Sequence, residues 1–82
     1  MKFYKFYADW CGPCKVLTAN LEKAGINYDA IDADTNEEMC QKYKVRNLPT
    51  FIAVDENEDE LGRFTGIKSP IAIKEWIKSL NE

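Results

Sequence analysis

Hydrophobic and polar positions recur along the chain with two periods, and together they predict seven elements. Aromatic-rich, alternating or continuously apolar stretches indicate strands at residues 2–7, 26–32, 50–54 and 61–65. Apolar residues three and four positions apart predict helices over residues 11–24, from 36 to about 43, and from Pro70 onward. The predicted order is β-α-β-α-β-β-α.

Residues typical of helix starts support this division. Ser69 is expected to cap the last helix, with Pro70 at its first position. Asp34 or Thr35 is expected to cap the second helix, because Thr35 and Glu38 have the spacing of a capping box. The last helix carries an apolar stripe that we expect in the core, formed by Ile73, Trp76, Ile77 and Leu80.

The order of elements indicates an α/β fold with a mixed sheet. A helix between the first two strands implies that they pair in parallel, and a short turn between the last two implies an antiparallel hairpin. Right-handed crossovers then place the three helices on both faces of a four-stranded sheet. We expect one domain that spans residues 1–82.

Composition and charge exclude several classes of function. With 45% apolar and 30% charged residues, the chain has the balance of a soluble globular protein. The net charge is −3 and no basic cluster occurs, so nucleic acid is not an expected partner. No apolar run approaches the roughly 18 residues that cross a membrane, and the N-terminus does not resemble a signal peptide. We therefore expect a cytoplasmic protein without a membrane partner.

Two cysteines in the stretch "DWCGPCK" carry the candidate chemistry. Cys11 lies where a strand leads into a helix, and the free N–H groups and dipole of a helix N-terminus favour an anion. The thiol pKa is expected to fall below its free value of about 8.5, and the thiolate is the reactive form. Cys14 lies one turn later, so Cys11 can attack a substrate disulfide and Cys14 can resolve the mixed disulfide.

Other roles for the cysteines remain open at this point. A structural disulfide between Cys11 and Cys14 would close a very small loop and would constrain the unfolded chain little. A structural zinc site needs about four ligands, whereas the chain has three cysteines and no histidine. An iron–sulfur cluster shared between two chains is a further alternative. Cys40 on the second helix is expected as a small, partly buried residue, with a regulatory or dimer-forming thiol as the alternative.

Three segments resemble the thioredoxin family: "WCGPCK" at 10–15, "VRNLPTF" at 45–51 and "FTG" at 64–66. Thirty-five residues separate Cys14 from Pro49, which is similar to the family's spacing. The resemblance covers nearly the whole chain, and it implies a protein-disulfide oxidoreductase with Cys11 as nucleophile and Cys14 as resolving thiol. It further implies an exposed rim around the dithiol, formed by Trp10, Gly12 and Pro13.

The same resemblance implies a substrate groove beside the dithiol. Leu48–Pro49 would be a cis peptide, and the Leu48 backbone would pair with an extended substrate segment. An ordinary trans proline at the start of a strand is the alternative. Gly66 would line the groove, or would be a plain turn glycine.

The resemblance also implies partners and cofactors. The expected partners are a flavoenzyme like thioredoxin reductase, or the glutathione system, and client proteins that contain disulfides. No cofactor or metal beyond the redox-active Cys11–Cys14 disulfide is expected, and we expect a monomer.

The chain departs from the family in its size. Thioredoxins usually begin with an extra strand and helix, and the elements predicted here are closer to those of a glutaredoxin. However, the motif is not the Cys-Pro-Tyr-Cys usual for glutaredoxins, and no clear Gly-Gly segment lies near Gly66. A glutathione-dependent, glutaredoxin-like oxidoreductase is therefore the alternative function.

Lys5 is a second departure, since the family usually carries a buried aspartate six residues before the first cysteine. The family's partner lysine on the next strand is replaced by Ala30. We hypothesise that the Lys5 ammonium favours the thiolate and makes the protein a stronger oxidant. The alternative is that the Lys5 side chain extends to solvent and has no effect on the dithiol.

Overall fold

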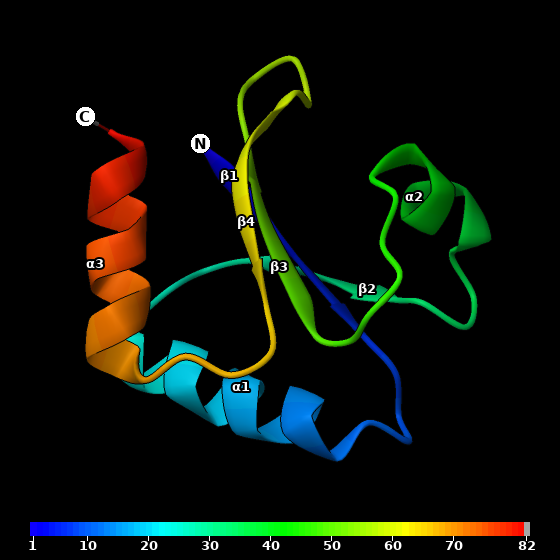
Figure 1. Cartoon of the computed structure of the whole chain (residues 1–82), viewed down its shortest axis with the longest axis horizontal. Coiled ribbons are helices and arrows are strands. Elements are labelled where there is room, and N and C mark those ends of the chain that lie inside the picture. The colour runs from blue at the N-terminus through cyan, green and yellow to red at the C-terminus, as the bar shows by residue number, and fades with distance from the viewer. Residues whose placement is uncertain (82) are drawn as a thin grey trace.

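The computed structural model describes residues 1–81, and its elements follow the predicted order (Figure 1). The strands are β1 (Lys2–Tyr7), β2 (Asp29–Asp32), β3 (Thr50–Val54) and β4 (Glu60–Thr65). The helices are α1 (Gly12–Ala24), α2 (Glu37–Lys42) and α3 (Pro70–Leu80).

The four strands form one mixed sheet in the order β2-β1-β3-β4. β1 pairs in parallel with β2 and antiparallel with β3, and β3 pairs antiparallel with β4. All five residues of β3 are buried, because this strand lies inside the sheet with side chains packed on both faces. The mixed sheet predicted from the order of elements is confirmed.

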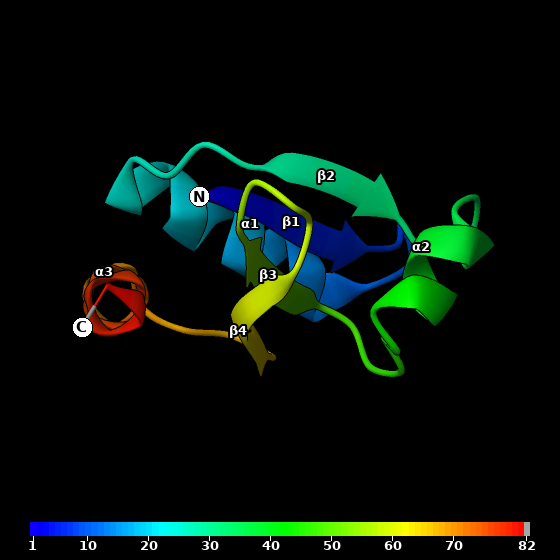
Figure 2. The ribbon, with the colours of Figure 1, turned by 90° about the horizontal axis from the view of Figure 1, so that it is seen from above.

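The helices are divided between the two faces of the sheet, as Figures 1 and 2 show. α1 and α3 pack together on one face, and their core consists of Leu17, Leu21, Ala24, Phe51, Phe64 and Ile73. The C-terminal end of α2 covers the other face, where the core consists of Tyr4, Phe6, Tyr43, Ile52 and Val54. The strands alternate between these cores because successive side chains point to opposite faces.

The second strand is shorter than the predicted range 26–32. Gly25 ends α1 in the left-handed conformation, with φ of 72°. The next amide, that of Ile26, donates to the carbonyl of Leu21 at 3.1 Å. The amides of Gly25 and Ile26 thereby donate hydrogen bonds to the last carbonyls of α1. Because the Ile26 amide is bonded to the helix, pairing with β1 begins only at Asp29.

The predicted cap of α2 is wrong. The N-cap residue is Asn36, and its side chain makes no capping hydrogen bond within the described residues. The Thr35 hydroxyl instead donates to the carbonyl of Asp32 at 3.4 Å, and the Asp34 amide donates to the Asp32 carboxylate at 3.0 Å. The side chain of Asp32 therefore organises a turn before the helix, and the Thr35 hydroxyl belongs to that turn.

Side-chain hydrogen bonds also organise the start of α3 and the turn between β3 and β4. Ser69 caps α3 as predicted, since its hydroxyl accepts a hydrogen bond from the Ala72 amide at 3.1 Å. In the acidic turn between β3 and β4, the Asp55 carboxylate accepts from the amides of Asn57 and Asp59 at 2.8 and 3.0 Å. β4 then starts at Glu60, one residue before the predicted start.

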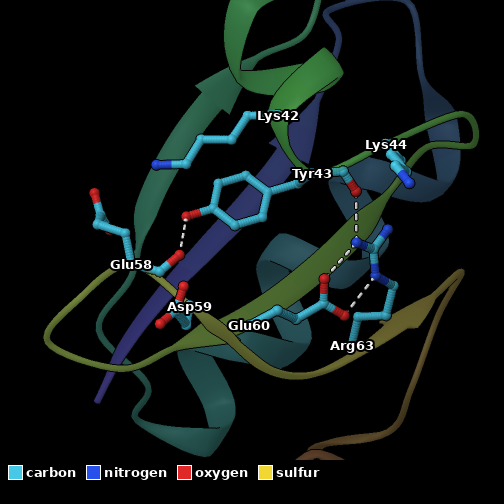
Figure 3. Close-up of a pocket in the computed structure, with 7 residues that line it drawn as sticks. All are labelled: Lys42, Tyr43, Lys44, Glu58, Asp59, Glu60 and Arg63. Carbon is cyan, nitrogen blue, oxygen red and sulfur yellow. Dashed lines mark hydrogen bonds and ion pairs between the residues drawn. The ribbon is translucent and has the colours of Figure 1, made fainter.

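A polar cluster joins this hairpin to the end of α2 (Figure 3). The Arg63 guanidinium donates to the Glu60 carboxylate and, at 2.5 Å, to the carbonyl of Tyr43. The Tyr43 hydroxyl donates to the carbonyl of Glu58 at 2.7 Å. The hydrogen bonds from Arg63 hold the pKa of Glu60 below its usual range. The cluster thereby joins the C-terminal end of α2 to the edge strand β4.

The apolar stripe of α3 faces the sheet as predicted. Ile73 is fully buried, and Trp76 and Ile77 are partly buried against the same core. Across residues 1–81, none of the helices combines the length and the apolar character that crossing a bilayer would demand.

Candidate redox site

The dithiol lies where β1 leads into α1. Cys11 is the N-cap residue of α1, and its sulfur accepts a hydrogen bond from the Cys14 amide at 3.2 Å. Pro13 lies in the first turn, where the helix needs no amide donor. Cys11 and Cys14 are joined by a disulfide, and their Cα atoms are 5.3 Å apart. The structure thus brings the two predicted catalytic sulfurs together at a helix N-terminus.

Both sulfurs are screened from bulk water. Cys11 is 4% exposed and Cys14 is 2% exposed, and they pack with Ala8, Tyr7 and Leu48. In the reduced protein, the free N–H groups and dipole at the start of α1 would stabilise a thiolate at Cys11. The arrangement can therefore carry out thiol–disulfide exchange.

The predicted rim surrounds this pair. Trp10 is 72% exposed, and Gly12 and Pro13 are exposed beside it. The Trp10 indole nitrogen donates to the carboxylate of Asp34 at 3.0 Å. The sequence indicated Asp34 only as a candidate helix cap, because no sequence pattern relates it to a residue 24 positions earlier.

The predicted groove residues belong to the segment that contacts the dithiol and to the strand end bonded to it. The Leu48–Pro49 peptide bond is cis, and Leu48 packs against the two cysteines. The Pro49 carbonyl accepts from the amide of Gly66 at 2.9 Å, so Gly66, with φ of 82°, is joined to the same segment. Within residues 1–81, the amide and carbonyl of Leu48 make no hydrogen bond to other main-chain groups.

A cavity of about 380 Å³ lies next to this segment. Trp10, Arg46 and Leu48 are among the residues that line it, so it connects the exposed rim to the cis-proline segment. Cys40 also lines it. The cavity provides an open groove beside the dithiol in which part of a peptide can lie.

Cys40 is partly buried and forms no disulfide. Burial raises the pKa of its thiol, and the carboxylate of Glu37 raises it further. This agrees with the predicted small, partly buried residue. Within residues 1–81, no group of three or more histidine, cysteine or acidic side chains is arranged to hold a metal ion.

Lys5 is buried, which contradicts the alternative that it extends to solvent. The residue is 5% exposed, and its ammonium donates to the hydroxyl of Thr18 and, at 3.4 Å, to that of Tyr28. On the neighbouring strand Ala30 lies opposite Lys5. The partners Thr18 and Tyr28 were missed by sequence analysis, although Thr18 follows Cys14 by one helical turn.

This sheet, with the disulfide at the start of α1 and the proline segment packed beside it, defines the thioredoxin fold. A sequence model of the thioredoxin family matches residues 3–79. The chain therefore belongs to the thioredoxin family.

Individual relatives agree with this assignment. Thioredoxin-1 of Drosophila melanogaster is 39% identical over 67 residues, which cover 74% of this chain and 62% of that protein. Mitochondrial thioredoxin of Mus musculus is 33% identical over 81 residues, which cover 92% of this chain and 48% of that protein. The chain thus spans less than two thirds of the length of either relative.

Solved structures show the same fold. The structure of the germline-specific thioredoxin Deadhead from Drosophila melanogaster superposes with a TM-score of 0.81 at 31% identity. The match covers 95% of this chain and 78% of that one.

Proposed function

We propose that this protein is a thiol–disulfide oxidoreductase that reduces disulfides in client proteins. The observation that carries the proposal is the Cys11–Cys14 disulfide at the N-terminus of α1 in a chain of the thioredoxin family. Only this helix N-terminus carries two sulfurs within bonding distance among the described residues.

The reaction proceeds in two exchange steps. The Cys11 thiolate attacks one sulfur of the client disulfide, forms a mixed disulfide and releases the other client sulfur as a thiolate. The Cys14 thiol then loses its proton and attacks the sulfur of Cys11. This step forms the Cys11–Cys14 disulfide and releases the second client thiolate, so two electrons pass to the client.

The surroundings of the dithiol support an extended segment of the client as the substrate. The exposed residues Trp10, Gly12 and Pro13 form one side of the approach to Cys11. The free main-chain groups of Leu48, which packs against the dithiol, can pair with such a segment, and Gly66 faces open space. Pro49 positions Leu48 through the cis bond.

Reduction of the Cys11–Cys14 disulfide back to the dithiol requires two electrons from a partner. We propose a flavoenzyme of the thioredoxin reductase type as the donor, a monomeric protein, and action in the cytoplasm without a metal or other cofactor. Support for this partner comes from the family to which the chain belongs.

Insulin reduction tests this function. The protein with a thioredoxin reductase and NADPH should reduce insulin over many turnovers, whereas the Cys11→Ser variant should be inactive. The Cys14→Ser variant should accumulate a covalent adduct with the client, detected by mass spectrometry. Cys40→Ser, a nearly isosteric change at a groove-lining thiol that takes no part in either exchange step, is the matched control and should keep multiple turnovers.

Two outcomes would contradict the proposal. Multiple turnovers by the Cys14→Ser variant would show that Cys14 does not resolve the mixed disulfide. Efficient recharging by glutathione and glutathione reductase, with none by thioredoxin reductase, would instead indicate a glutaredoxin-like electron donor.

A further inference from the structure

Lys5 is a buried charge that the two exchange steps do not use. Its ammonium lies 5.1 Å from the ring centre of Tyr7 and 4.9 Å from that of Tyr28, and it donates to the hydroxyls of Thr18 and Tyr28. Aromatic faces and hydroxyl oxygens stabilise a cation without neutralising it. These contacts therefore allow Lys5 to remain positively charged inside the protein.

The same ammonium is directed to the part of α1 that contains Cys14. The Thr18 hydroxyl, which accepts from Lys5, donates to the carbonyl of Cys14 at 3.0 Å. Lys5, Thr18 and Cys14 also line one cavity of about 360 Å³, and Cys11 is not among its lining residues. Lys5 thus borders the same cavity as the resolving cysteine and is linked to its backbone through Thr18.

The other charged groups around this cavity lie at its exposed edge. Asp9 and Lys15 line it and are exposed to solvent, while Tyr7 lines it and presents its aromatic ring to Lys5. Facing Lys5 from the adjacent strands are Ala30 of β2 and Phe51 of β3, neither of which carries a charge. Within residues 1–81, no buried carboxylate faces Lys5 or Cys14 in this cavity to accept the proton of Cys14.

We propose that Lys5 is the positioning residue of the resolving step, because its ammonium stabilises the thiolate of Cys14. The inference rests on the function proposed above and assigns the effect to Cys14 rather than to Cys11. The Cys14 proton passes to water in the shared cavity, and the thiolate attacks the Cys11 sulfur and expels the client thiolate. An ammonium has no lone pair and cannot accept this proton, so Lys5 acts by charge alone.

Two measurable consequences follow from this role. A neighbouring cation lowers the pKa of an acidic group, so Cys14 should ionise at lower pH in the presence of Lys5 than without it. Stabilising the reduced protein relative to the disulfide should also make the protein a stronger oxidant. A lysine that serves only to fill space would produce neither effect.

The first experiment uses the unmodified reduced protein and requires no substitution at Lys5. The ¹³Cε and ¹⁵Nζ signals of Lys5 are followed by NMR while pH is raised through the ionisation of Cys14. We expect an inflection at the Cys14 pKa that disappears in the Cys14→Ser variant. A Lys5 signal that stays flat through this ionisation would overturn the proposal.

The second experiment measures the thiolate of Cys14 directly. In a background of Cys11→Ser and Cys40→Ser, the ultraviolet absorbance of the Cys14 thiolate is titrated with and without Lys5→Met. We expect the pKa of Cys14 to rise by about 1 unit or more in the Lys5→Met variant and to stay near the parent value with Lys5→Arg. Lys23→Met, an equal loss of charge on an exposed residue of α1, should leave it unchanged.

The outcomes separate this inference from the proposed function. An unchanged Cys14 pKa in a folded Lys5→Met variant would overturn the role of Lys5, while insulin reduction by the parent would still stand. If Lys5→Met does not fold, the NMR titration of the parent decides alone. In a glutathione buffer, the fraction of oxidised Lys5→Met protein should exceed that of the parent, and an equal fraction would count against the proposal.

Discussion

At the residue scale, Cys11 and Cys40 have opposite surroundings. Cys11 lies at a helix N-terminus, where amides and the helix dipole favour a thiolate. Cys40 is partly buried beside the Glu37 carboxylate, and both features raise the pKa of its thiol. Two thiols of the same chemical type should therefore differ strongly in reactivity.

We expect iodoacetamide to modify Cys11 of the reduced protein at least about ten times faster than Cys40 at neutral pH, since each pKa unit changes the thiolate fraction about tenfold. Mass spectrometry of peptides after timed alkylation measures both rates. Glu37→Gln is the control and should speed modification of Cys40 without affecting Cys11. Equal rates at Cys11 and Cys40 would contradict this expectation.

From the residues alone, the candidate site could be predicted only where they are close along the chain, whereas the distant Leu48, Pro49 and Gly66 were assigned to it through the resemblance to the thioredoxin family. Cys11, Cys14 and the rim follow from a short motif, because helix geometry fixes their relative positions. The surroundings of Lys5 could not be predicted this way, since Tyr28 lies 23 residues later in the chain and only the tertiary fold brings its side chain to Lys5. The hydrogen bond between Trp10 and Asp34 was missed for the same reason.

At the scale of elements, apolar periodicity predicted the type and order of every helix and strand, but not all of their ends. Strand pairing begins at Asp29 rather than Ile26, because the Ile26 amide completes the end of α1. The Thr35 hydroxyl is used by the turn at Asp32 instead of by α2. In both cases a residue with the right sequence pattern is bound to a neighbouring element by a competing hydrogen bond.

Two hydroxyl residues before helices should therefore respond differently to substitution. Ser69→Ala should lower the free energy of unfolding by about 1 kcal/mol, because the Ala72 amide loses its capping partner. Thr35→Ala should lower it by only a few tenths of a kcal/mol, as expected for an exposed residue without a capping bond. Urea unfolding followed by circular dichroism measures both values, and a larger loss for Thr35→Ala would contradict the assignment of the caps.

At the scale of the whole molecule, one aromatic residue connects most of the elements. Phe51 on β3 is fully buried, and its ring packs with those of Phe3, Tyr28, Phe64 and Trp76. These rings come from β1, the segment before β2, β4 and α3. The core between the sheet and its two packed helices therefore depends on this side chain.

Phe51→Ala should lower the free energy of unfolding by about 3–5 kcal/mol, as large-to-small substitutions in cores do. The free energy of unfolding of a native protein is only about 5–15 kcal/mol, so the variant should be close to unfolding. Leu61→Ala, which changes an exposed apolar residue of β4, is the control and should have a small effect. Thermal unfolding of both variants gives the comparison, and a Phe51→Ala variant as stable as Leu61→Ala would show that the cluster contributes little.

The hydrogen bonds between Arg63 and Glu60 also make the stability of the molecule depend on pH. They lower the pKa of Glu60 in the folded state, so the carboxylate contributes stability above its unfolded pKa of about 4.3. This contribution is lost as pH falls through the lower folded pKa. Because the pair is partly exposed, it should amount to less than about 1 kcal/mol.

Glu60→Gln should therefore be less stable than the parent at pH 7, and the difference should shrink as pH is lowered below about 4. Urea unfolding at a series of pH values measures it. Glu56→Gln removes a charge from an exposed residue of the same turn and serves as control. A stability difference that grows as pH falls would mean that folding raises the pKa of Glu60 instead of lowering it.

The strand order has a consequence for the protein in concentrated solution. β2 and β4 are the outer strands, and each presents charged side chains, Asp29 and Asp32 on one and Glu60 and Arg63 on the other. Charges on an outer strand oppose the lateral addition of a second chain. Crowded molecules of this protein should consequently resist joining their sheets into fibres.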